Sequence, residues 1–203
     1  MSDNLAPRNK FPIKKSTVLK KPEKRKAKVT MNSIADYEEI YRYSIEQPEA
    51  FWAEVASDLH WFQPWTTVLT WKEPFATWFA QAKTNLAFNC LDRHLPQFAD
   101  KIALFWEGEP GEQRQFSYQQ LHHEVCRFAN GLKKIGVKKG DCVTLYMPLL
   151  PELIIAVLAC ARIGAIHNVV FAGYSVQSLA SRIRDSKSRV VVTGVSTWSN
   201  YSS

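Results

Sequence analysis

Apolar positions are densest between Val137 and Val170, and their arrangement there predicts a β-α-β unit. The residues from Cys142 to Met147 form an apolar run of strand length, rich in types that favour an extended backbone. Pro151 suits the first turn of a helix, where its missing N–H would be unpaired, and Gly164 suits the end of one. Residues 165–170 form a second apolar run. The two strands are therefore expected to be parallel, with a right-handed crossover between them.

The predicted helix of this unit is apolar on nearly all sides. Between Leu149 and Ala165 the only charged residues are Glu152 and Arg162. A surface helix has one polar face, and a half-exposed strand alternates apolar and polar residues. Because neither pattern is present, the unit is expected to lie inside a large α/β domain. Its sheet should be covered on both faces, by more protein than this chain supplies.

Helical and aromatic patterns fill the sequence before this unit. Apolar residues recur at helical spacing from Tyr37 to Ile45, and Pro48 opens a second predicted helix. Residues 61–79 are crowded with aromatic residues and interrupted by prolines, which predicts an irregular segment anchored against the domain. Bases can stack on such aromatic residues, but that function needs interleaved basic residues, and Lys72 stands almost alone.

Residues 89–95, NCLDRHL, predict a further helix. Three of its residues are expected to face inward: Cys90, Leu91 and Leu95. Asp92, Arg93 and His94 could be taken for a catalytic group. A histidine without a partner at the spacing of a metal site or a catalytic triad is more often structural, and we expect a structural role here.

A hairpin and a capped helix follow. Strands are predicted at 101–106 and 113–116, on either side of a turn that contains glycine and proline. Ser117 and Gln120 have the spacing of a capping box, which starts a helix that ends near Gly136.

Past the central unit, Ser175 is expected to cap one more helix, and Arg189–Thr193 to form a third strand of the sheet. Three residues of this helix are expected to face inward: Val176, Leu179 and Ile183.

In the helix after Ser117, His122 and His123 are adjacent, so they lie on different sides and cannot chelate a metal together.

Positive charge is concentrated at the N-terminus. Residues 1–30 contain ten basic and two acidic residues, a net charge of +8, whereas the whole chain carries +7. This segment is poor in aromatic residues and is broken by prolines, so a disordered basic tail is predicted. Two alternatives are a polyanion-binding arm, which is disfavoured by the absence of a repeat, and upstream sequence preceding a start at Met31.

The cysteines and the hydropathy pattern indicate a soluble cytoplasmic protein. None of the four cysteines is paired at a metal-ligand spacing: Cys90, Cys126, Cys142 and Cys160. Thiols among apolar neighbours pack as small hydrophobic groups. No window approaches eighteen apolar residues without a charge, and the first thirty residues lack the apolar core of a signal peptide. No membrane association is expected.

Sequence motifs for catalysis are missing. In open α/β sheets, ligands bind at the carboxyl ends of the strands, which here are the loops at Pro148, at 171–175 and at Gly194. None of these loops has the glycine pattern of a phosphate-binding loop, and no nucleophile elbow or zinc-protease motif occurs.

The chain nevertheless resembles a known family. The segments YEEIYRYSIEQPEAFWAEVA, NCLDRHL, ALFWEGEPGE, SYQQLHHEVCRFANGLKKIGVKKGD, YMPLLPE, LACARIGAIHNVVFAGYS and RIRDS together resemble the N-terminal part of AMP-forming acetyl-CoA synthetases. The resemblance implies an α/β fold, a partial N-terminal domain of the adenylate-forming superfamily. It also implies a reaction in which ATP and Mg²⁺ activate acetate to an acetyl-adenylate, from which the acyl group passes to CoA.

The resemblance implies one weak CoA site. The family's Phe-Gly-Gly turn corresponds to Phe171, Ala172 and Gly173, and the methyl group of Ala172 stands where the family has a glycine. The next CoA-contacting loop of the family carries an arginine, where residues 195–198 have none. For Phe171, CoA contact and a plug at the end of the strand are both open. No catalytic and no metal-binding residue is expected.

The resemblance also sets the expected organisation of the chain. We expect a disordered tail at 1–30, a helical and aromatic-rich segment at 34–95, an incomplete AMP-binding domain at 96–193 and an end outside the family at 194–203. The family's phosphate loop, acyl pocket and catalytic lysine lie beyond this stretch. A truncated synthetase, inactive alone and binding none of its cofactors productively, is therefore predicted. The alternative is a non-catalytic module that docks on a complementary synthetase fragment or a paralogue; nucleic acid is not an expected partner.

Overall fold

Residues 32–194 are described here from a computed structural model of the 203-residue chain. The predicted basic tail and residues 195–203 lie outside the described residues. The chain divides at Pro48 into two units. Within residues 32–194, no helix is both long and apolar enough to cross a bilayer.

The described part of the first unit is helix α1, Ile34–Glu46, which confirms the helix predicted there. Ser33 caps it by accepting a hydrogen bond from the backbone N–H of Asp36. The apolar side chains of α1 include Tyr37 and Tyr41, whose rings stack at 6.1 Å. No residue of α1 is buried.

The second unit begins with helix α2, Pro48–Ala56, followed by a hairpin of strands β1, Thr67–Lys72, and β2, Phe75–Ala80. The expectation of an irregular segment at 61–79 was therefore wrong over most of its length. Pro74 lies in the turn between the two strands, where it removes no ladder hydrogen bond. The aromatic and β-branched residues around it favour a pleated backbone.

The helix expected at 89–95 is divided among three short elements: α3, Leu86–Cys90; a 3₁₀ turn, η1, Asp92–His94; and α4, Leu95–Phe98. Leu91 is buried as predicted, but Cys90 is exposed, which contradicts the prediction for that residue. Asn89 takes the inward position because its amide bonds both the N–H and the C=O of His60. This satisfies the backbone of the preceding loop.

The hairpin and the capped helix that follow are confirmed. Strands β3, Ile102–Glu107, and β4, Gln113–Ser117, pair antiparallel and lead into helix α5, Tyr118–Lys134. The capping box of Ser117 and Gln120 is complete, since each side chain bonds the backbone N–H of the other residue.

The β-α-β unit is also confirmed. Strand β5, Cys142–Met147, helix α6, Pro151–Ile163, and strand β6, Ile166–Phe171, follow one another, and the strands are parallel. Gly164 ends α6 in the left-handed conformation, with φ of 74°. Strand β7, Val190–Thr193, pairs with the other side of β5, so the strand order is β6-β5-β7.

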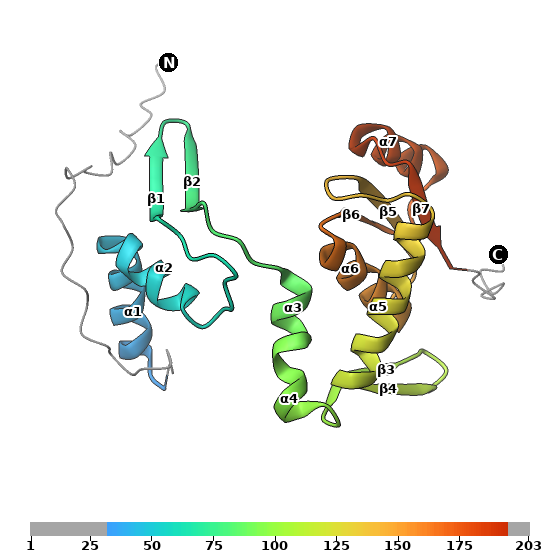
Figure 1. The fold of residues 1–203 in the computed structure, drawn as a ribbon, viewed down its shortest axis with the longest axis horizontal. Helices are drawn as coiled ribbons and strands as arrows, with labels where there is room; N and C mark the ends of the chain where they lie inside the picture. Colours follow the sequence, from blue (N-terminus) through green and yellow to red (C-terminus); the bar gives the residue numbers. More distant parts are fainter. Residues whose placement is uncertain (1–31, 195–203) are drawn as a thin grey trace, which may run out of the picture. The chain divides into compact units, whose positions relative to one another are not determined.

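The sheet lies between two helical layers (Figure 1). On one face, Val143 and Leu145 are fully buried in the core that α5 and α6 share. On the other face, helix α7, Val176–Ser186, is joined to the strands by a hydrogen bond from Asn168 to Ser186. Ser175 caps α7 as predicted, but Val176, the first residue of the helix, is 79% exposed and does not face inward.

Helix α6 is buried without any further protein around it. Seven of its residues are buried, and α3, α5, β5 and β6 all pack against it. The expectation that this helix needs more protein than the chain supplies was therefore wrong for most of its surface. Strand β6 differs from the prediction in the opposite sense, since Ile166, Val169 and Phe171 are exposed where coverage on both faces was expected.

Candidate functional site

The carboxyl ends of the three parallel strands meet at one edge of the sheet. Met147 of β5 lies beside Phe171 of β6, and Tyr146 lies beside Thr193 of β7. This edge is the expected position of a ligand in an open α/β sheet. The loop of residues 171–175 runs along it, between the end of β6 and the cap of α7.

Phe171 and Gly173, the two residues predicted to contact CoA, are in direct contact with each other. The ring of Phe171 folds over Gly173, and a Cβ added to Gly173 would lie 2.6 Å from Cε1 of that ring. A glycine is therefore required for this approach. The Phe171 side chain is 59% exposed, so it does not form a plug buried at the end of the strand. One of its neighbours is Tyr174, whose ring meets it edge to face at 6.0 Å.

Tyr146 holds the conformation of this loop, a role that was not among the predictions from the sequence. Its hydroxyl donates to the carbonyl of Ala172 at 2.7 Å and lies 3.3 Å from the carbonyl of Tyr174. On the outside of the loop, the guanidinium of Arg182 stacks over the ring of Tyr174 at 4.5 Å. The sequence did contain a signal for this role: Tyr146 is the penultimate residue of β5, so its side chain lies near the carboxyl ends of the strands.

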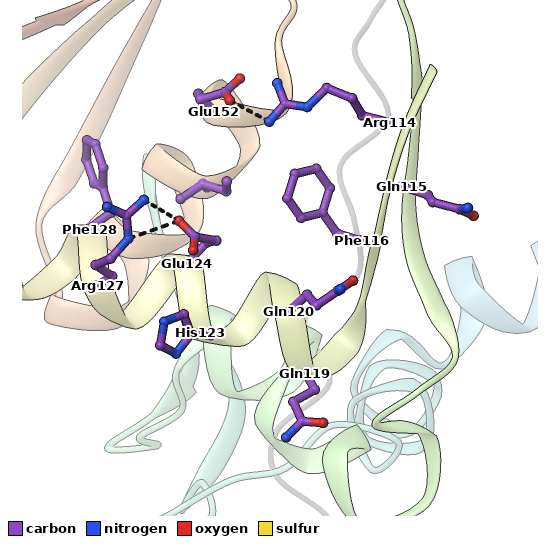
Figure 2. Close-up of a pocket in the computed structure, with 11 residues that line it drawn as sticks. Arg114, Gln115, Phe116, Gln119, Gln120, His123, Glu124, Arg127, Phe128 and Glu152 are labelled. Carbon is purple, nitrogen blue, oxygen red and sulfur yellow. Dashed lines mark hydrogen bonds and ion pairs between the residues drawn. The ribbon is translucent and has the colours of Figure 1, made fainter. Parts of the chain in front are cut away.

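A separate cavity of about 670 Å³ lies between β4, α5 and α6 (Figure 2). Apolar side chains line part of it, among them Phe116, Phe128 and Ile155. Its charged residues are neutralised in pairs. Arg114 bonds Glu152 at 2.8 Å, and Arg127 bonds Glu124 one turn earlier on the same helix.

The pairing with Arg114 lowers the pKa of Glu152. Burial alone would raise the pKa of Glu152, but the hydrogen bond from Arg114, a backbone hydrogen bond and the charge of Arg114 outweigh it, and the pKa is held below its ordinary value. A carboxylate held ionised by an arginine is a poor general acid near neutral pH. The pair joins the β3–β4 hairpin to the start of α6.

The expected structural role of the NCLDRHL segment is supported by its contacts. Asp92 accepts two hydrogen bonds from Arg162 of α6 and lies 3.3 Å from Nε2 of His122 on α5. Arg93 donates to the carbonyl of Asp58, and the ring of His94 packs on Tyr118. His123 lines the cavity of Figure 2, whereas His122 contacts Asp92, so the two adjacent histidines do lie on different sides of α5.

The acidic groups at the sites described above are engaged with basic neighbours. Within residues 32–194, no group of three or more His, Cys, Asp or Glu side chains could hold a metal ion. The carboxylates of Asp92, Glu124 and Glu152 are each paired with an arginine. At the loop predicted to contact CoA, the ring of Phe171 is exposed. The guanidinium of Arg182 lies over the ring of Tyr174 in the same loop.

Two family models match the chain in succession. The model of the acetyl-coenzyme A synthetase N-terminus matches residues 37–90, and the AMP-binding enzyme model matches residues 91–202. The chain belongs to the AMP-binding enzyme family. Within that family, the chain is similar to acetyl-coenzyme A synthetases, which confirms the resemblance drawn from the sequence.

The relatives are much longer than this chain. An acetyl-coenzyme A synthetase of Deinococcus radiodurans is 53% identical over 165 residues, which are 81% of this chain and 25% of that protein. The enzyme of Chlorobaculum tepidum is 42% identical over 95% of this chain and 28% of its own length. The solved acetoacetyl-CoA synthetase of Streptomyces lividans superposes with a TM-score of 0.73 at 28% identity, over 77% of this chain and 25% of that one. The chain thus spans about a quarter of these relatives.

Proposed function

We propose that this chain provides the N-terminal scaffold of an AMP-forming acetyl-CoA synthetase and does not catalyse the reaction by itself. In the proposed reaction, acetate and ATP give acetyl-adenylate and pyrophosphate, and CoA then takes the acetyl group and releases AMP. The observation that carries the proposal is the succession of the two family matches along 37–202.

The inactivity of the isolated chain follows from the chemistry of the first step. Charge that develops between the α- and β-phosphates must be stabilised by positioned cations and backbone N–H groups, usually with Mg²⁺. The sequence has no glycine-rich phosphate loop, and the three carboxylates at the sites described above are committed to arginines. We therefore propose that ATP, Mg²⁺ and CoA, the cofactors of the family reaction, do not bind productively to these 203 residues.

The test compares the chain alone with a chimera. In the chimera, residues 34–193 replace the matched segment of the Deinococcus radiodurans enzyme, and acetate-dependent exchange between ATP and pyrophosphate is measured. We expect no exchange above background from the chain alone, and exchange by the chimera. Exchange by the chain alone would disprove its inactivity. A folded but inactive chimera would disprove the scaffold role.

A second candidate function is a non-catalytic module that docks on a complementary synthetase fragment or a paralogue. It is supported by the exposed apolar residues on β6. A cytoplasmic location stays a prediction. So does the weaker hypothesis of a nucleic-acid-binding arm, since that segment lies outside the described residues.

A further inference from the structure

A second cavity, of about 580 Å³, lies near the start of β5, at the opposite end of the strand from the loop of residues 171–175. The second half of α5 and the loop after it form most of its wall, and the end of α6 completes it. None of the residues that line it is acidic, and four are basic: Lys133, Lys138, Lys139 and Arg162. The cavity is therefore a region of positive charge, which attracts anions.

Arg162 contributes a hydrogen-bond donor that the described residues do not use. Its Nη1 and Nη2 bond Asp92, but its Nε is buried and has no acceptor within residues 32–194. Leaving a buried donor without an acceptor is unfavourable. The wall that Arg162 forms therefore suits a ligand that brings an anionic acceptor.

A nucleophile lines the same cavity. The thiol of Cys126, on α5, is partly exposed, and its Sγ lies 3.6 Å from Nε2 of His122, one turn earlier. The same Nε2 lies 3.3 Å from Oδ1 of Asp92. Cysteine reacts as its thiolate, and here the imidazole provides an acceptor for the thiol proton. Once Nε2 has taken that proton, its N–H can donate to Asp92.

The other three cysteines lack this combination. Cys90 is more exposed than Cys126, but it lines neither of the two cavities, and neither does Cys142. Cys160 is buried, and burial together with the charge of Cys142 raises its pKa to about 11, so it stays protonated. Exposure alone would therefore favour reaction at Cys90, whereas the positive cavity favours Cys126.

We propose that Cys126 is a site of reversible thiolation by small disulfides that carry negative charge on carboxylate or phosphate groups. The proposal does not depend on the scaffold role. Sγ of Cys126 passes its proton to Nε2 of His122 and attacks one sulfur of the disulfide. A sulfur–sulfur bond to Cys126 forms while the bond within the disulfide breaks, and the leaving thiolate takes the proton from His122. Cys126 is thereby oxidised, and one half of the disulfide is reduced to a thiol.

The experiment compares two disulfides of opposite charge on the 203-residue chain. Near neutral pH, glutathione disulfide is negatively charged and cystamine is positively charged. Peptide mapping by mass spectrometry gives the rates at which each forms a mixed disulfide at Cys126 and at Cys90. We expect glutathione disulfide to react faster at Cys126. The ratio of the Cys126 rate to the Cys90 rate should be at least about tenfold higher with glutathione disulfide than with cystamine, and this difference should shrink in about 1 M NaCl.

A matched pair of lysine variants tests the role of the cavity. Lys133→Glu reverses a charge on the cavity wall, whereas Lys134→Glu makes the same change at the next residue of α5, which does not line the cavity. Lys133→Glu should slow the reaction of glutathione disulfide with Cys126 by at least about threefold, and Lys134→Glu by less than about 1.5-fold. Both lysines are exposed, so both variants should fold, as circular dichroism can check.

Three outcomes would each overturn the proposal. Glutathione disulfide could react at Cys90 as fast as at Cys126, or faster. The ratio of the two rates could be the same for both disulfides, which would show that the charge of the cavity plays no part. Equal effects of Lys133→Glu and Lys134→Glu would assign the preference to the overall charge of α5. The comparison of the two disulfides uses the wild type alone, so it stands even if a variant fails to fold.

Discussion

The guanidinium of Arg162 donates two hydrogen bonds to the carboxylate of Asp92, from Nη1 to Oδ1 at 3.1 Å and from Nη2 to Oδ2 at 2.6 Å. Arg162 belongs to the last turn of α6, and Asp92 begins the 3₁₀ turn η1. His122 of α5 lies 3.3 Å from the same carboxylate. The carboxylate of Asp92 therefore links η1, α5 and α6. The side chains of Asp92 and Arg162 are both mostly buried.

This relationship predicts a pH dependence of stability. Burial alone would raise the pKa of Asp92, but the hydrogen bonds and charge of Arg162, together with His122, outweigh it and lower the pKa. A lowered pKa in the folded state contributes stability above the unfolded pKa of about 3.9, and this contribution is lost as the pH falls through the lower folded value. Asp92→Asn should cost about 1–3 kcal/mol at pH 7 and nothing below both pKa values.

Thermal unfolding between pH 7 and pH 2 measures this effect. The stability difference between the wild type and Asp92→Asn should shrink as the pH falls below 4. The exposed Asp185 provides the matched control, since Asp185→Asn should change stability little at any pH. A difference that stays constant down to pH 2 would refute the coupling of Asp92 to protonation.

Asn85 caps two helices at once, and this predicts a substitution that separates the two roles. Its Oδ1 accepts from the N–H of Phe88 at the start of α3, and its Nδ2 donates to the carbonyls of Ala161 and Arg162 at the end of α6. Asn85→Asp keeps the acceptor for α3 but places a carboxylate beside the negative end of α6. We expect it to lower the free energy of unfolding by about 2 kcal/mol.

Urea denaturation measures the cost, with Ser175→Asp as the comparison. The side chain of Ser175 accepts from the N–H of Ser178 in α7 and contacts no second helix end within residues 32–194, so an aspartate there preserves the cap. Its effect should stay within about 0.5 kcal/mol. Equal effects of the two aspartates would show that the bonds of Asn85 to α6 contribute nothing.

The hydroxyl of Tyr146 is predicted to hold the loop of residues 171–175. Tyr146→Phe removes the 2.7 Å hydrogen bond to the carbonyl of Ala172 and should cost about 1 kcal/mol. The amides of the loop should then exchange faster with solvent. Tyr174→Phe, which keeps the ring under Arg182, is the control and should leave the exchange unchanged. Exchange rates that are the same in wild type and Tyr146→Phe would contradict this role.

The indole of Trp106 connects the β3–β4 hairpin to the loop before α6. Its Nε1 donates to the carbonyl of Leu149 at 2.7 Å, and the guanidinium of Arg114 lies over its ring. Trp106→Leu should reduce stability by about 2 kcal/mol, because it removes both the hydrogen bond and the stacked ring. Phe105→Leu on the same strand, at a side chain that is 74% exposed, should cost less than about 0.5 kcal/mol in the same urea titration. Equal costs would exclude a contribution from the Leu149 contact.

Local signals were sufficient for most elements of the chain. The capping box at Ser117, the proline at the start of α6 and the left-handed Gly164 each determine a helix end within a few residues, and the structure has all three. The parallel arrangement of β5 and β6 also followed from the sequence, because two strands joined by one helix have few other arrangements. The family could be identified because its sequence segments occur in order along the chain.

Predictions from the sequence were wrong or incomplete where a residue contacts a partner that is distant along the chain. The β1–β2 hairpin was missed because its prolines and tryptophans suggested an irregular segment, and its register depends on pairing between strands. Cys90 was assigned to the core because it is apolar, whereas Asn89 occupies that position to bond the loop at His60. The candidate loop was found at Phe171 and Gly173, but the contribution of Tyr146 was not.

The sequence by itself determined the class of fold, the central β-α-β unit and the family, because these depend on periodicity, caps and motifs within short segments. Tertiary structure alone decided how α6 is covered, which edge of the sheet is left open and which carboxylates are paired with arginines. Those features depend on residues far apart along the chain, such as Asp92 and Arg162, which are 70 positions apart. Only the folded chain brings such residues within hydrogen-bonding distance.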